Sequence, residues 1–143
     1  MTPDIEKALA EWLATEEIDA SPFTGLDSSL QPNDAQTVTI FVSDAPRAVG
    51  PLYRATCNFI VSTPPLADEE MSNALTRHRS KSRELHDLLA SPPAVSLANA
   101  LETVSSLYYR GAFLRDGGTS TVDEGRWITT LEVTLGISTD EGA

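Results

Sequence analysis

The sequence predicts an α+β fold: a four-stranded, mostly antiparallel sheet with one long and one or two shorter helices packed on one face. Four segments alternate apolar and polar residues with the period of two that marks a strand with one buried face. One long segment between the second and third strands repeats apolar residues at helical spacing. No repeat or second domain is evident, so residues 1–143 are predicted to form one domain with frayed ends at 1–2 and 139–143.

The N-terminal segment is predicted to form an amphipathic helix from Pro3 to about Thr15. Apolar residues recur there at steps of three and four: Ile5, Ala8, Leu9, Trp12 and Leu13. Residues 16–36, EEIDASPFTGLDSSLQPNDAQ, follow with two prolines, a glycine and many small polar residues. This composition predicts a long connection, with a short extended piece around Phe23.

The first two strands are predicted in TVTIFVSDA and LYRATCNFIVSTPP. The first places Val38, Ile40 and Val42 on one face. The second runs from Tyr53 to Ser62 and is the most regular stretch in the chain. Its inward side is predicted to carry Tyr53, Ala55, Cys57, Phe59 and Val61, and its other side is polar except for Ile60. PRAVGP between them carries turn formers, so the two strands are expected to be antiparallel neighbours.

The long helix is predicted from Ala67 to Leu89, with three acids (residues 68–70) in its first turn, where the helix dipole favours negative charge. The middle of the apolar face of this helix carries His78 and Ser82. We therefore expect the helix to pack against the core through more polar contacts there than at its ends. A short helix is predicted in AVSLANALE, with two leucines directed inward, Leu97 and Leu101.

The last two strands are predicted in TVSSLYYRGAFLRDGG and RWITTLEVTLGIS, which form a hairpin. Trp127, Leu131, Val133, Leu135 and Ile137 alternate with polar residues in the second of these. TSTVDEG between the two segments is predicted to be a polar, mobile loop tip.

Charge and composition exclude several classes of function. The net charge of −11, from 21 acids and 10 bases, opposes general nucleic-acid binding and docking on anionic membranes. No apolar run approaches the ~20 residues of a membrane helix, and the N-terminus does not resemble a signal peptide. We therefore expect the protein to be synthesised in a cytoplasm and not to associate with a membrane. The single cysteine, Cys57, is expected to be a packed thiol in a reducing compartment.

No catalytic or metal-binding motif is evident, so no enzymatic activity, metal or cofactor is predicted. The two histidines, His78 and His86, are eight residues apart, whereas a helical metal pair needs about four. His78 is instead expected to be a partly buried polar residue. Paired acids occur only in loops or at a helix start, where they are not desolvated as general acid–base work requires.

A basic cluster, RHRSKSR, holds four of the ten bases: Arg77, Arg79, Lys81 and Arg83. On a helix, at about 100° per residue, they flank the apolar stripe on both sides. They could form a solvated face that covers the core edge, or a row of cations that meets acids of a neighbouring subunit. Arg54 and Asn58, on the polar face of the second strand, complete the candidates for a subunit interface.

A second set of candidates lies in LRDGGTSTVDEGRW. Charged residues there surround glycines: Arg115, Asp116, Asp123, Glu124 and Arg126. This stretch could be a solvated loop, or an arm or pore-lining loop that becomes ordered on contact with a partner.

The order of these segments resembles a known family. The resemblance runs through the N-terminal helix, FTG before TVTIFVSDA, the strand YRATCNFIVSTPP, a helix ending in LHDLL, and a final GRWITTLEVTLGIS. It covers most of the stretch from Ile5 to Ser138. The chain resembles the tail terminator or tail-completion proteins of tailed bacteriophages, which close the tail tube or lie at the head–tail junction.

The resemblance implies a virion protein of the tail or neck, assembled in the host cytoplasm, with no catalytic residues. Its subunits would form a ring, commonly a hexamer, around a channel that DNA passes without specific binding. Its partners would be the tail tube protein and a head-completion or connector protein. A related device outside phages would share the same features. The alternatives are a small α+β binding module that uses its open sheet face for a protein or peptide, or an enzyme without a recognisable motif.

Overall fold

A computed structural model describes residues 1–23, 35–116 and 118–142, except for the side chain of Asp116. Most of the predicted connection, including Thr24 and Gly25 of the FTG stretch, lies outside the described residues. In chain order the described elements are α1 (Thr2–Thr15), β1 (Ser21–Pro22), β2 (Thr37–Asp44), β3 (Arg47–Val49), β4 (Leu52–Thr63), α2 (Met71–Ala90), α3 (Ala94–Ala100), the π-helical turn η2 (Leu101–Ser105), β5 (Tyr108–Asp116), β6 (Thr121–Asp123) and β7 (Arg126–Ser138).

The α+β class is confirmed, but the sheet is mixed and has seven described strands instead of four. Their order is β1-β2-β4-β7-β5, with β3 on β4 and β6 on β7. The four predicted strands are β2, β4, β5 and β7, and they pair antiparallel as expected. β1 pairs parallel to β2, which makes the sheet mixed. The three additional strands are only two or three residues long, so no alternation marks them in the sequence.

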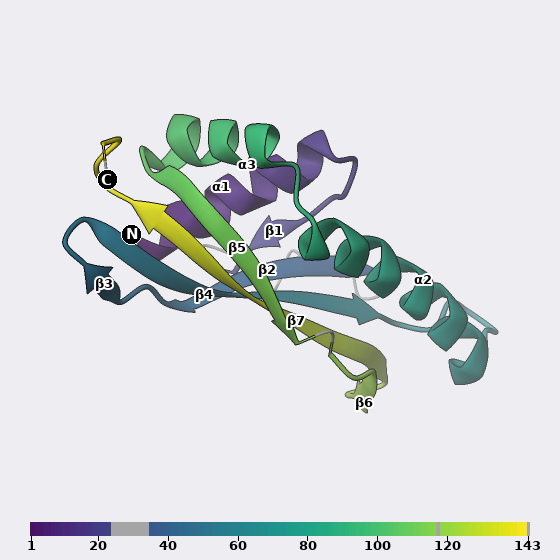
Figure 1. Cartoon of the computed structure of the whole chain (residues 1–143). Coiled ribbons are helices and arrows are strands. Elements are labelled where there is room, and N and C mark those ends of the chain that lie inside the picture. The colour runs from purple at the N-terminus through teal and green to yellow at the C-terminus, as the bar shows by residue number, and fades with distance from the viewer. Residues whose placement is uncertain (24–34, 117, 143) are drawn as a thin grey trace.

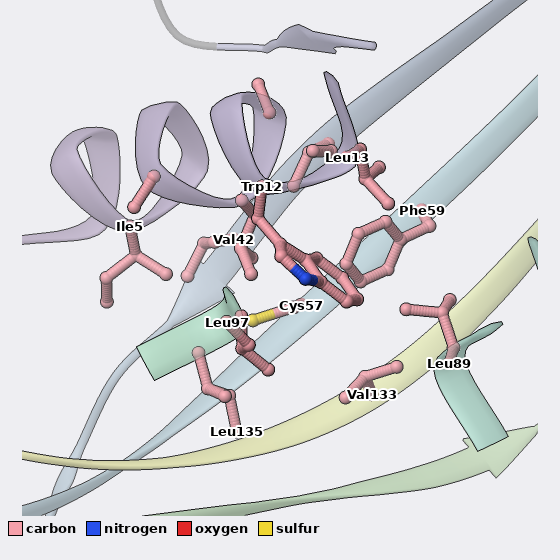
Figure 2. Close-up of a cluster of buried hydrophobic side chains, with 14 of the residues drawn as sticks. Ile5, Trp12, Leu13, Val42, Cys57, Phe59, Leu89, Leu97, Val133 and Leu135 are labelled. Atoms are coloured by element: carbon pink, nitrogen blue, oxygen red, sulfur yellow. The ribbon is translucent and has the colours of Figure 1, made fainter. Parts of the chain in front are cut away.

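The helices cover one face of the sheet, as Figure 1 shows, and leave the other face open. α1 contacts β2, α2 contacts β4 and β7, and α3 contacts β5. The predicted alternation in β4 is confirmed at Ala55, Cys57, Phe59 and Val61, which are at most 1% exposed. In Figure 2 the Trp12 indole stands beside Phe59 at the centre of the layer between helices and sheet. None of the helices in the described part of the chain is long and apolar enough to span a membrane.

The long helix begins at Met71, four residues later than predicted. The acids at 68–70 precede it instead of forming its first turn. Asp68 adopts a positive φ of 65°, and the Glu69 carboxylate accepts a hydrogen bond from the Leu66 N–H at 2.9 Å. This turn holds the chain out of helical geometry until Glu70, which is the N-cap.

The helical segment after α2 is longer than predicted, because α3 continues into η2 as far as Ser105. The strand predicted from Thr103 therefore starts only at Tyr108. Ser106 ends the helix with a left-handed φ of 58°. The inward placement of Leu97 and Leu101 is confirmed, at 2% and 0% exposure.

Candidate functional site

The open face of the sheet is the first surface that could bind a partner. Its central rows run across β7, β4 and β2: Thr134 beside Thr56, then Glu132, Asn58 and Phe41, then Thr130, Ile60 and Thr39. These side chains point away from the helices because their neighbours along each strand are buried. Half of these residues are threonines, and the others are one amide, one carboxylate and two apolar side chains. The polar side of the predicted second strand thus lies at the middle of a surface that no described helix covers.

Aromatic rings stand at both ends of this open face. Phe113 on β5 lies beside Thr134 and is 68% exposed. At the opposite end, the rings of Phe23 and Phe41 meet edge to face with centroids 4.9 Å apart, and Phe23 is 52% exposed. An aromatic ring held in water forgoes a large part of the free energy that burial would supply. These rings are the groups on this face that a protein partner would cover most favourably.

β5 is the last strand in the sheet order, and in the described part of the chain no strand pairs with its outer side. Its ladder with β7 is interrupted twice, between Tyr109 and Gly111 and between Leu114 and Asp116. Such irregularities limit uncontrolled pairing at an edge without preventing pairing with a specific partner.

Asn58 and Arg54, two of the predicted interface residues, lie on the open face. The side-chain amide of Asn58 donates a hydrogen bond to the Phe41 carbonyl at 3.2 Å and is half-buried. Arg54 is exposed near the start of β4.

The predicted loop candidates are divided between the sheet and a hairpin tip. Arg115 lies 3.7 Å from Glu132 on the open face. The side chain of Asp116 lies outside the described residues. Asp123 and Glu124 are exposed at the turn between β6 and β7, so the predicted loop is partly a strand.

Arg126 does not extend into solvent from this tip. Its Nε donates to Ser62 Oγ at 2.5 Å, and a terminal nitrogen donates to the Ala35 carbonyl at 2.7 Å. Partial burial lowers the pKa of Arg126 from its ordinary value, and the group remains charged. The side chain therefore fastens the start of β7 to the end of β4 and to the residues before β2.

The basic cluster separates into two pairs. Arg77 donates to Glu69 at 2.8 Å and to the Pro64 carbonyl at 2.9 Å, and Glu69 raises the pKa of this guanidinium. Lys81 lies 3.3 Å from Glu84. Arg79 and Arg83 form no hydrogen bond or ion pair through their side chains in the part of the chain that the structure describes. They line a pocket between α2 and the segment that leads into β6.

A buried hydroxyl network surrounds His78, which is fully buried and not partly buried as predicted. Thr63 Oγ1 lies 2.7 Å from Nδ1, and Thr129 Oγ1 lies 2.6 Å from Nε2. Gln36 donates to Thr63 at 2.9 Å, and Ser120 lies 3.0 Å from Thr129. Burial lowers the pKa of His78, so the ring is neutral at pH 7.

The partners of His78 were not among the predicted site residues. Thr63 and Thr129 occupy inward positions of β4 and β7, on the same side of their strands as the buried Val61 and Leu131. A threonine at an inward position is the signal that could have indicated a buried polar partner on the facing helix.

Cys57 is a buried free thiol, as predicted. Burial, with a smaller contribution from the charge of Glu6, raises its pKa to about 12. The Glu6 carboxylate on α1 is itself buried and accepts the Val42 N–H at 2.9 Å. A thiol held protonated in this way is a packing group and a poor nucleophile.

The described residues contain no group of three or more histidine, cysteine or acidic side chains that could hold a metal ion. Comparisons with protein-family models and with curated proteins found no match to this chain. Among the described residues, three features could bind a partner: the open sheet face, the β5 edge without a pairing strand, and Arg79 and Arg83 on α2.

Proposed function

We propose that this protein is a structural subunit that assembles through its sheet into a closed ring. By its resemblance to tail terminator and tail-completion proteins, we propose that this ring caps the tail tube of a tailed phage and joins it to the head or neck. The ring would be a hexamer around the DNA channel, in contact with the tube protein below and a completion or connector protein above.

The observation that carries the proposal is the open face with its exposed aromatic rings beside an unpaired edge. Phe113 stands on the edge strand itself, so a neighbour that pairs with β5 would also cover this ring. Pairing at an edge by identical subunits is completed without free ends only when the assembly closes. In a ring, one contact between neighbouring subunits would both form hydrogen bonds along the β5 edge and bury the Phe113 ring.

The charge of the chain supports the proposed role of a channel wall. Each subunit carries a net charge of −11, and a ring multiplies that charge around its centre. A wall of this sign repels phosphates, so DNA can pass without being retained.

The first test is the absolute mass of the purified protein by light scattering at tens of micromolar protein. A ring predicts about six times the subunit mass of 15.4 kDa. Phe113→Asp is expected to shift the mass toward the monomer, because a charge would have to be buried in the contact. Val95→Asp is the matched control, since Val95 is 76% exposed on α3, on the helix-covered side of the sheet and not on its open face.

A second experiment addresses the cap itself. Purified tail-tube protein is polymerised with and without this protein, and tube lengths are measured by electron microscopy. A terminator is expected to shorten and narrow the length distribution, and Phe113→Asp is expected to restore long tubes. A monomeric protein that leaves tube length unchanged would exclude the proposal and favour the binding-module alternative.

A further inference from the structure

A polar pocket lies between α2 and the segment from Gly118 to Ser120, with Thr129 of β7 also in its wall. Its volume is about 720 Å³, within the range of ~300–1,000 Å³ typical of small-molecule sites. It is on the helix-covered side of the molecule, whereas the proposed assembly surface is the open face and the β5 edge (Figure 1). The pocket therefore lies on the opposite face of the sheet from the proposed ring contact.

The two unpartnered arginines of α2 both line this pocket. Of the ten bases in the chain, six have a partner for their side chain: Arg47, Arg77, Lys81, Arg110, Arg115 and Arg126. The remaining four, in the described part of the chain, are Lys7, Arg54, Arg79 and Arg83. Two of these four therefore stand together at one pocket of an otherwise acidic protein.

Arg79 and Arg83 are four residues apart, so they are neighbours on one face of the helix. Like charges at this spacing repel each other and destabilise the helix slightly. An anion held between the two guanidinium groups would remove that repulsion and accept charge-assisted hydrogen bonds from both. One carboxylate, Asp87, also lines the pocket, one helical turn after Arg83, and lies 3.6 Å from the His86 ring.

Hydroxyl groups complete the pocket wall. Ser82 is among the lining residues, and its Oγ is the one buried side-chain polar atom without a hydrogen-bond partner in the described part of the chain. Buried hydroxyl groups normally form at least one hydrogen bond. The Ser82 hydroxyl is therefore a donor that could bind an acceptor atom of a ligand. An oxygen-rich ligand against the wall could provide it after a rotation of the serine side chain.

The wall opposite α2 is held by a close backbone approach. A Cβ on Gly118 would lie 2.5 Å from the Thr130 carbonyl oxygen, and the residue adopts a φ of +74°. Ser120 is tied to Thr129, and Thr129 to the buried His78. These contacts fix the wall before any ligand arrives.

We propose that this pocket binds an oxyanion, a phosphate or carboxylate group, between the guanidinium groups of Arg79 and Arg83. The group can belong to a free anion or to an acidic side chain of another protein. A nucleic-acid strand is a poor ligand, because the net charge of −11 opposes the approach of a polyanion.

The test is a titration of the ¹⁵N-labelled full chain with inorganic phosphate, followed by NMR chemical shifts against sodium chloride at equal ionic strength. We expect saturable shifts centred on α2 and the segment from Gly118 to Ser120, with a dissociation constant of about a millimolar or lower. The double variant Arg79→Gln/Arg83→Gln is expected to bind at least about tenfold more weakly. The matched control, Lys7→Gln/Arg54→Gln, removes the same charge from two unpartnered bases outside the pocket and should bind as the wild type does.

Ser82→Ala provides a second variant that does not depend on charge. It is expected to weaken phosphate binding several-fold while the fold, followed by the same spectra, is retained. The absence of saturation, or equal weakening in the two double variants, would overturn the proposal. An acidic peptide such as acetyl-Asp-Glu-Asp-Glu-amide, titrated in parallel, identifies the source: at least tenfold tighter binding of the peptide indicates a protein side chain, and the reverse indicates a free anion.

Discussion

At the scale of single residues, the buried histidine has the clearest measurable consequence. His78 has a hydroxyl at each ring nitrogen and no exposure to solvent. Replacing it with leucine leaves the hydroxyls of Thr63 and Thr129 without this partner inside the core. Each hydroxyl keeps one partner, Gln36 or Ser120, so the loss is its hydrogen bond to the ring, typically about 0.5–1.5 kcal/mol each. We expect His78→Leu to reduce the free energy of unfolding by about 1–3 kcal/mol, measured by urea denaturation at pH 7.5.

The same histidine should contribute to the acid sensitivity of the fold. Burial lowers its pKa in the native state, so below the unfolded-state value of about 6.5 the unfolded chain binds a proton that the native chain does not. Its contribution to stability is therefore complete above pH 6.5 and declines as the pH falls toward the native pKa. Denaturation between pH 7.5 and 5 should show a shallower pH slope in His78→Leu than in the wild type. Parallel slopes in the two proteins would contradict this assignment.

Cys57 allows an independent measurement of global opening. With its pKa raised to about 12, only about one thiol in ten thousand is ionised at pH 8, and the side chain is fully buried. We expect a thiolate-directed reagent to label the native protein only as fast as the chain unfolds. Labelling in urea should be rapid, and rapid labelling in native buffer would show that strand β4 opens locally.

At the scale of elements, the two positive-φ glycines between the end of β5 and the start of β7 distinguish the cost of backbone strain from the cost of a steric clash. Gly118 and Gly125 have φ values of +74° and +76°, but only Gly118 would bring a Cβ against neighbouring backbone. Gly125→Ala is expected to cost about 1–2 kcal/mol, the cost of a left-handed alanine. Gly118→Ala should cost about 1–3 kcal/mol more, because the segment must move away from Thr130. Urea denaturation measures the free energy of unfolding of both variants. An equal decrease in the two would show that the backbone around Gly118 can move away from Thr130 at little cost.

The sequence predicted the elements in which periodicity is long enough to be read. β2, β4 and β7 follow their alternation, and α1 follows its helical spacing. The helix predicted from Ala67 starts four residues later, at Met71. The turn from Leu66 to Glu69 provides hydrogen bonds for the backbone N–H groups of both residues, so these residues need not be helical. The strand before β6 was begun too early because the π-helical turn carries the helix through Thr103, a β-branched residue typical of strands.

The sites were less predictable than the elements, for a physical reason. The basic cluster was identified, but which of its members are paired depends on Glu69 and Glu84, whose reach follows from the turn and the helix geometry. The pocket combines α2 with residues around Gly118 and Thr129, which are brought together only by the hydrogen-bonded packing of helix on sheet. No local pattern encodes such a meeting of distant segments.

At the scale of the whole molecule, charge determines how the proposed ring should respond to salt. Each subunit carries −11, so assembly brings like charges together. The screening length falls from about 30 Å at 10 mM salt to about 8 Å at 150 mM. We expect the mass from light scattering to increase over this range at fixed protein concentration. A decrease would show that attraction between opposite charges dominates the contact, for which Arg54 is an exposed cation on the open face.

The pairing of β4 with β7 also determines when the chain can fold. Thr63 pairs with Trp127 and Leu52 with Ser138, so the two central strands of the sheet lie almost half the chain apart. β5, too, has β7 as its partner in the sheet. During synthesis from the N-terminus, β4 can pair with β2 early, but its other edge and β5 must wait for their partner strand until β7 has left the ribosome. The sheet is expected to close only after β7 has been synthesised, and a stop codon before Arg126 would leave a product with no means of closing it.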